Sequence, residues 1–242
     1  MQQSPFAVAI HTKDIQPRWG PSMLIHETIA PLARADEAVR QLIYDKSCVI
    51  GDEGFSRVIC MNKTQVLKLT CCAATIELLN GLKKPEPALR RNPCLPVVHA
   101  SLGLCALDAD GILYEGFVLK RLWPLGAFFA RDRSPYWAKF RKARFQELAD
   151  SITRVQQFEL SNPLYGDQPL WQSCVRIAKS LSGYSGQELN VGFEYLERFC
   201  NRHKAELDIL TKGNILFDEN CHAILADPVT SPFIWRPWLA RC

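Results

Sequence analysis

The sequence lacks the cysteine and histidine spacings that zinc sites and disulfide-rich proteins show. Its ten cysteines are scattered, two of them adjacent at Cys71 and Cys72, and no C-x-x-C pair occurs. No cysteine–histidine group has the spacing of metal ligands. A chain of 242 residues is also large enough to fold without covalent staples. These absences predict free thiols in a reducing cytoplasm.

Long apolar segments and strong charge are missing as well. No apolar run approaches the roughly 18 residues of a membrane helix, and no basic segment leads into an apolar one at the amino terminus. We therefore expect a cytoplasmic protein without a membrane partner. The formal charge of +4 is mild and does not favour nucleic acid as a partner. With 48% apolar residues the chain can bury a sizeable core.

Residues 1–45 predict an N-terminal leader followed by a helix. Proline and glycine residues before residue 22 favour an extended leader. From about Met23 to Tyr44 the apolar residues recur at an imperfect helical period. Pro31 is expected to kink or divide this helix.

Residues 46–120 predict a small antiparallel sheet with one helix. Three short β-prone runs, 48–50, 57–60 and 65–69, are separated by brief turns and suit a meander. A helix is expected over 73–80, ended by Gly81 and the prolines that follow. Two further strands are expected over 97–104 and 112–119.

Residues 121–242 predict a mainly helical segment that ends in a β-hairpin. Helical periodicity is present over 134–158, 170–181 and 187–203. Short apolar runs at 215–217 and 223–225 then flank a polar turn. The whole pattern predicts an α+β fold.

The turn that begins at Gly51 is the first candidate for chemistry. Small and flexible residues between two strands can lay backbone N–H groups over phosphates. Gly51, Gly54 and Ser56, with Phe55 among them, suit such a turn. A plain β-turn fits the same residues.

Lys68 is the second candidate, because it lies in the middle of an apolar strand. Such a lysine can bury its stem and direct its ammonium group into a cleft. Glu77, nine residues on in the expected helix, is a candidate counter-charge. An edge-strand lysine and a solvated helical glutamate are the alternatives.

The third candidate is a set of three oxygen-bearing side chains around the C-terminal hairpin. Asp208 follows the last long helix, Asn214 precedes the hairpin, and Asp227 follows its second strand. Carboxylate and amide oxygens are ligands for hard cations such as Mg²⁺, although such residues also form turns and caps. Their order along the chain, after the turn and Lys68, predicts a phosphoryl-transfer site.

These motifs resemble the protein-kinase-like superfamily over about residues 46–232. The segments that carry the resemblance are GDEGFSRV, VLKLT, LD-x-x-x-x-GNILF and ADPV. They are most similar to the early protein kinases of short-tailed lytic phages of the T-seven type. The resemblance implies a two-lobed fold, with a small antiparallel-sheet N-lobe (46–120) and a reduced, mostly helical C-lobe (121–242) that carries the catalytic loop.

The resemblance also implies a nucleotide-binding half of the site. Lys68 would hold the α- and β-phosphates of ATP and pair with Glu77. The backbone near 118–122 would cup the adenine. The residues that would cover the nucleotide are Gly51, Gly54, Phe55 and Ser56.

The same resemblance implies a catalytic half of the site. Asp208 would orient the attacking hydroxyl and accept its proton, and Lys212 would reach the transferred phosphate. Asn214 and Asp227 would hold Mg²⁺. ATP and Mg²⁺ are therefore the expected cofactors.

The chain departs from the kinase pattern in three places. Glu206 replaces the histidine before Asp208, five residues instead of four separate Asp208 from Asn214, and no A-P-E segment lies in the fifteen residues after Asp227. Substrate recognition is then expected from the middle helices, the leader or another chain. Thr230 and Ser231 are candidates for autophosphorylation.

Three functions remain open from the sequence. The first is an ATP- and Mg²⁺-dependent kinase acting on serine or threonine of proteins in the cytoplasm of a bacterial host. The second is a pseudokinase that binds and modulates a host protein, and the third is a small-molecule phosphotransferase. The basic run 131–144 suits either a solvated helix face or docking to an acidic surface. The sequence does not indicate an oligomeric state.

Overall fold

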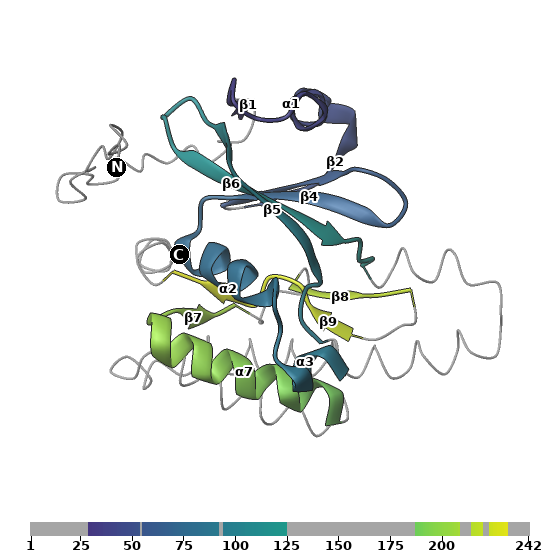
Figure 1. The fold of residues 1–242 in the computed structure, drawn as a ribbon, viewed down its shortest axis with the longest axis vertical. Helices are drawn as coiled ribbons and strands as arrows, with labels where there is room; N and C mark the ends of the chain where they lie inside the picture. Colours follow the sequence, from purple (N-terminus) through teal and green to yellow (C-terminus); the bar gives the residue numbers. More distant parts are fainter. Residues whose placement is uncertain are drawn as a thin grey trace, which may run out of the picture.

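The computed structural model describes six ranges of the chain: 29–53, 55–91, 94–124, 187–208, 214–219 and 223–231 (Figure 1). Several sequence predictions lie outside these ranges. They are the leader, the helices expected over 134–158 and 170–181, the basic run 131–144, Gly54 and Lys212.

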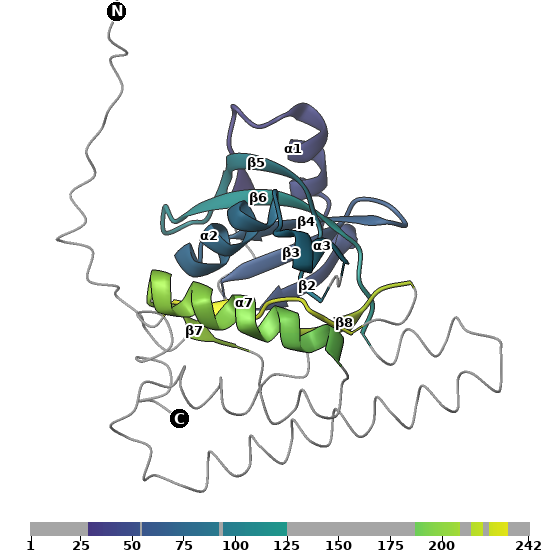
Figure 2. The ribbon, with the colours of Figure 1, turned by 60° about the horizontal axis from the view of Figure 1, so that its bottom comes forward.

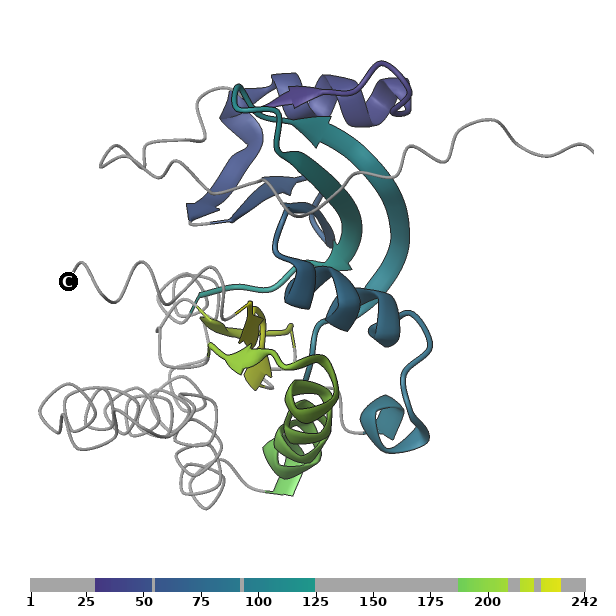
Figure 3. The ribbon, with the colours of Figure 1, turned by 90° about the vertical axis from the view of Figure 1, so that its left-hand side faces the viewer.

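A curled antiparallel sheet of six strands forms the larger part of the described fold (Figure 3). Its order is β1-β5-β6-β4-β3-β2. The strands are β1 (Ala30–Pro31), β2 (Val49–Glu53), β3 (Ser56–Cys60), β4 (Gln65–Thr70), β5 (Val98–Leu107) and β6 (Leu113–Lys120). The predicted meander of β2, β3 and β4 and the β5–β6 hairpin are confirmed.

The predicted helix from Met23 to Tyr44 is wrong over residues 29–36, the part before α1 that the structure describes. Helix α1 spans Glu37–Tyr44, and Ala30 and Pro31 instead form β1, which pairs with β5. Asp36 caps the helix, since its side chain accepts a hydrogen bond from the Ala38 N–H at 2.9 Å. Pro31 is tolerated in β1 because an edge strand does not need every N–H for the ladder.

Strand β4 is buried on both faces, and its alternation directs Lys68 towards α2 (Ala73–Leu82). Leu67 and Leu69 pack in one apolar cluster with residues of α1. Val66 belongs to a different cluster, which contains Leu79 of α2. Because side chains alternate along a strand, Lys68 shares the face of Val66. The strand therefore buries Lys68 to 4% exposure while pointing it away from α1.

A second apolar core lies beneath the sheet. Besides α2, its elements are α3 (Pro87–Arg91), α7 (Gln187–His203), β7 (Glu206–Leu207), β8 (Ile215–Phe217), β9 (Ala223–Leu225) and β10 (Val229–Thr230). The 3₁₀ turn η2 (Lys46–Cys48) instead leads into β2, and its Cys48 packs against the cluster of α1 and the sheet. Figures 1 and 2 show α2 between the sheet and α7. Buried residues of α2, α3, α7 and the four short strands share one apolar cluster. The predicted helix over 187–203 and the hairpin β8–β9 are confirmed.

The short strands are joined to the end of the sheet by individual polar contacts. Trp123, just after β6, exchanges two backbone hydrogen bonds of 2.9 Å with Phe217 of β8. Lys120 Nζ lies 2.7 Å from Glu219 Oε1. These contacts bring the end of β8 to the end of β6, and so set the hairpin against the sheet. Within the described ranges, no helix is long and apolar enough to span a membrane.

Candidate active site

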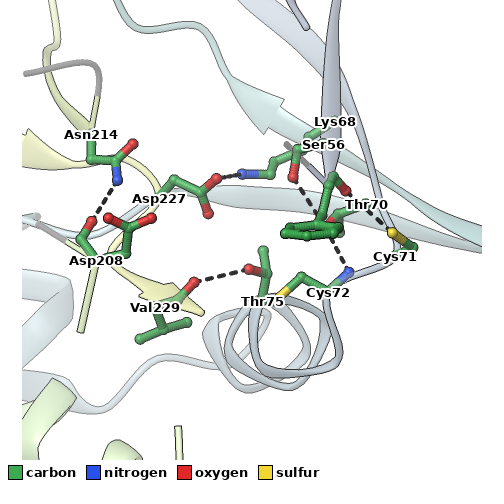
Figure 4. Close-up of polar contacts among 11 residues, drawn as sticks. Ser56, Lys68, Thr70, Cys71, Cys72, Thr75, Asp208, Asn214, Asp227 and Val229 are labelled. Atoms are coloured by element: carbon green, nitrogen blue, oxygen red, sulfur yellow. Dashed lines mark hydrogen bonds and ion pairs between the residues drawn. The ribbon is translucent and has the colours of Figure 1, made fainter. Parts of the chain in front are cut away.

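Lys68 and Asp227 form an ion pair, although they lie far apart in the sequence. Lys68 Nζ lies 2.7 Å from Asp227 Oδ2 (Figure 4). The lysine side chain is 6% exposed and the aspartate side chain 33% exposed. A buried ammonium needs a counter-charge, because removal from water penalises its charged form. The sheet therefore carries a cation into the site, and the segment after β9 supplies the anion.

Asp208 lies beside this pair, at the end of β7. Its backbone N–H donates to Pro228 O at 2.8 Å, and Leu207 and Glu206 pair with Val229 and Thr230. Burial, and next the negative charge of Asp227, raise the pKa of Asp208 to about 7, against smaller lowering effects of Asn214 and Lys68. A carboxyl group with this pKa exchanges a proton readily near neutral pH.

Asn214 connects the two aspartates. Its side-chain Nδ2 donates to the backbone carbonyl of Asp208 at 2.5 Å. The backbone carbonyl of Asn214 accepts a hydrogen bond from the N–H of Ala226, the residue before Asp227, at 2.7 Å. Figure 4 shows the three side chains of Asp208, Asn214 and Asp227 grouped on one side of Lys68.

Asp227 and Asn214 both have side-chain oxygens that could bind a cation. Asp227 Oδ1 is buried and has no hydrogen-bond partner in the part of the chain that the structure describes. Asn214 uses its Nδ2, which leaves its side-chain oxygen for another partner. In the described ranges, no group of three or more His, Cys, Asp or Glu side chains is arranged so that it could hold a metal ion by itself. Mg²⁺ is commonly held by one or two carboxylates together with water and substrate phosphates, so the donor set fits Mg²⁺.

The turn near Gly51 is hydrogen-bonded to the end of β4 and to the residue after it, just before α2. Gly51 pairs with Val58 in the β2–β3 ladder, and a Cβ at Gly51 would make only ordinary contact with it. Phe55 O accepts a hydrogen bond from the Cys71 N–H at 3.1 Å. The Ser56 hydroxyl donates to Thr70 Oγ1 at 3.1 Å. Phosphate binding by Gly51, Phe55 and Ser56 stays a prediction.

The expected ion pair between Lys68 and Glu77 is not formed. Both residues are described, and Lys68 pairs with Asp227 instead. Glu77 is exposed, because the buried face of α2 carries Ala74, Thr75 and Leu78. The sequence spacing placed Glu77 on the correct helix, but the direction of its side chain depends on how that helix packs.

The candidate phosphorylation positions differ in exposure. Thr230 is 6% exposed and pairs with Glu206 in the short ladder, whereas Ser231 is partly exposed. A kinase cannot reach a buried strand hydroxyl without opening the strand, so Ser231 is the accessible position of the two.

Two residues of the site were missed from the sequence. Thr75 of α2 donates its hydroxyl to Val229 O at 3.2 Å, and Thr70 accepts hydrogen bonds from both Ser56 and the Cys72 N–H. The only sequence signal is a threonine within a short helix and another at a strand end. Neither position has a motif, so packing alone reveals these contacts.

Comparisons with known proteins add little to this geometry. No family model matches the chain, and no curated protein matches it. Among solved structures, the chain is similar to the GDP complex of a point mutant of aminoglycoside 2'-phosphotransferase-IIIa. The identity is 14%, the match covers 88% of this chain and 70% of that chain, and the TM-score is 0.28. A TM-score this low carries no argument about the fold or chemistry of this chain.

Proposed function

We propose that this chain transfers the terminal phosphoryl group of ATP to a hydroxyl group, with the help of Mg²⁺. The observation that carries the proposal is the contact of 2.7 Å between Lys68 Nζ and Asp227 Oδ2. Asp208 and Asn214 lie at this contact and supply further oxygens. Phosphoryl transfer depends chiefly on positioning and charge, and these four side chains supply both.

Asp208 is assigned to the acceptor hydroxyl. Its carboxylate orients the hydroxyl and accepts the hydroxyl proton while the acceptor oxygen bonds to the terminal phosphorus and the bond from that phosphorus to the leaving ADP breaks. The pKa of about 7 suits this exchange, because a base works best when its pKa lies near the working pH. The hydrogen bond from Asn214 to the Asp208 carbonyl holds the loop that carries this base.

Lys68, Asp227 and Asn214 are assigned to the nucleotide and its metal ion. When bound, ATP supplies the phosphoryl group, and Mg²⁺ offsets the negative charge of its phosphate oxygens. Asp227 Oδ1 is the oxygen left for the cation, since Oδ2 accepts from Lys68. Lys68 holds phosphate oxygens through the same buried ammonium group.

The acceptor hydroxyl is proposed to belong to a protein. The resemblance of GDEGFSRV and LD-x-x-x-x-GNILF to phage early kinases supports serine or threonine of bacterial host proteins as acceptors. The same resemblance supports a two-lobed arrangement with a division near residue 120. A small-molecule hydroxyl is the alternative acceptor.

A pseudokinase is a second candidate, and two observations favour it. Five residues separate Asp208 from Asn214, one more than the kinase pattern has. Glu77 is exposed and does not reach Lys68. A chain of this type would bind a host protein and change its behaviour without chemistry.

Radiolabelled ATP separates these functions. The full chain is incubated with a bacterial lysate and Mg²⁺, next to Lys68→Ala, Asp208→Ala and the control Lys63→Ala, which alters an exposed turn. We expect labelled proteins with wild type and the control, and none with the other two variants. Label in small molecules alone would support the alternative acceptor. No label at all, together with a host-protein complex that survives both active-site substitutions, would reject phosphoryl transfer.

A further inference from the structure

Thr75 joins two elements that lie far apart in the sequence. It lies in the first turn of α2 and is 3% exposed. At this position the carbonyl four residues earlier belongs to Cys71, outside the helix, so the hydroxyl has no acceptor of the usual kind within α2. Thr75 instead donates to Val229 O at 3.2 Å, in a strand that lies far along the chain (Figure 4). The hydroxyl therefore joins α2 to β10.

The acceptor of this bond belongs to the segment that carries Asp227. Val229 is 2% exposed and follows Asp227 by two residues. On its other side, this segment is held by β7, where the Asp208 N–H donates to Pro228 O at 2.8 Å. The short segment from Asp227 to Val229 is thus held between Asp208 and Thr75, with a hydrogen bond to each of them.

The start of α2 is fixed to the sheet by similar contacts. The Cys72 N–H, at the N-cap of α2, donates to Thr70 Oγ1 at 3.2 Å. Thr70 also accepts the Ser56 hydroxyl at 3.1 Å. Thr70 lies on the same strand as Lys68, two residues on, so both side chains leave β4 on one face. The position of α2 is therefore tied to that of Lys68.

We propose that Thr75 is a positioning residue, whose hydroxyl sets Asp227 against Lys68 and Asp208 by holding the Val229 carbonyl. The inference rests on the proposed function. Glu77 is exposed, so in the described chain no carboxylate of α2 connects the helix to Lys68. The neutral hydrogen bond of Thr75 provides the connection instead. In this assignment Thr75 acts on Asp227 only through the backbone of Val229.

Three substitutions at Thr75 isolate the hydroxyl. Thr75→Val replaces the hydroxyl by a methyl group of similar size. Thr75→Ser and Thr75→Ala form a second pair that differs by the hydroxyl alone, which keeps the test usable should the valine variant fail to fold. The control Ile76→Val removes one methyl group from the neighbouring, partly buried position of the same helix turn.

The first measurement is steady-state phosphoryl transfer. We expect Thr75→Val and Thr75→Ala to lower kcat by about tenfold or more, because small displacements of reacting groups cost orders of magnitude in rate. KM for ATP should rise as well, since the displaced Asp227 is the residue assigned to the metal ion that accompanies ATP. Thr75→Ser and Ile76→Val should stay close to wild type. Equal losses in the serine and alanine variants would overturn the proposal.

The second measurement needs no activity. Amide hydrogen exchange of the free protein follows the Asp208 N–H, which is bonded to Pro228. We expect exchange about tenfold faster in Thr75→Val and Thr75→Ala, and unchanged exchange in Thr75→Ser and Ile76→Val. Unchanged exchange in all four variants would reject the role of Thr75. A wild-type protein that transfers no phosphate would reject the proposed function, and the exchange data would still decide whether Thr75 holds the Asp227 segment.

Discussion

The sheet and the segment around Asp208 and Asp227 are stabilised in different ways. The sheet has strands of up to ten residues, and Leu67 and Leu69 at its centre are fully buried. The region around Asp208 and Asp227 contains strands of only two residues, β7 and β10. It is held by one ion pair to Lys68, single hydrogen bonds and a shared apolar cluster. Substitutions in the sheet should therefore reduce stability, whereas substitutions of acidic residues should reduce activity.

The largest effect is expected from Asp208→Asn. Loss of the proton acceptor should lower kcat by about 10²–10⁴-fold. The thermal midpoint should stay the same or rise, because the substitution removes a buried carboxyl group next to the negative charge of Asp227. Asp110→Asn, in the exposed β5–β6 turn, is the matched control. If Asp208→Asn lost stability together with activity, the expectation that acidic residues affect activity and not stability would be wrong.

Leu67→Ala tests whether the sheet contributes mainly to stability. Truncation of this fully buried leucine should cost about 2–5 kcal/mol in the free energy of unfolding, measured by urea denaturation. Activity per folded molecule should remain within a few-fold of wild type. Leu113→Ala, at a strand position that is 39% exposed, should change stability little. A large fall in kcat with little loss of stability would contradict the structural role of Leu67.

A smaller effect is expected in the pH dependence of stability. The pKa of Asp208 is raised to about 7 in the folded protein, so between pH 4 and 7 the folded state binds more protons than the unfolded state. Its stabilising contribution is complete below about pH 4 and is lost as the pH rises through about 7. The free energy of unfolding of wild type, relative to Asp208→Asn, should fall by about 1–3 kcal/mol over this range. A flat difference would mean that Asp208 is not desolvated.

The smallest effect is expected at Glu77. Because its side chain is exposed and Lys68 pairs with Asp227, Glu77→Gln should change kcat and KM by less than about twofold. The control Glu86→Gln breaks an exposed ion pair of 2.9 Å with Arg198 and should be equally mild. A fall of about fifty-fold or more in Glu77→Gln would show that Glu77 reaches Lys68 during the reaction.

Much of the fold follows from local sequence patterns. Short β-prone runs separated by turns predicted the strands from β2 to β6, and the helical period placed α7 at its observed bounds. The start of α1 was missed because the periodicity before Pro31 outweighed the capping signal of Asp36. Strands of two residues, such as β7 and β10, are too short for any period to be recognised.

The candidate site was only partly predictable for a related reason. The residue types of Lys68, Asp208, Asn214 and Asp227 and their order pointed to one site, and the structure brings all four together. Which partner Lys68 takes could not be read from spacing, since the direction of Glu77 depends on the packing of α2 against the sheet. Pairing across the fold is a tertiary property, and no local pattern records it.

These four side chains are assigned to one site for ATP and Mg²⁺. Isothermal titration calorimetry of ATP, with and without Mg²⁺, on wild type, Asp227→Asn and the control Asp110→Asn would test this assignment. We predict that Mg²⁺ strengthens ATP binding by about tenfold or more, or about 1.4 kcal/mol, in wild type and the control. The gain should disappear in Asp227→Asn, which loses a carboxylate ligand. Absence of ATP binding in wild type, or an equal gain from Mg²⁺ in Asp227→Asn, would contradict the assignment.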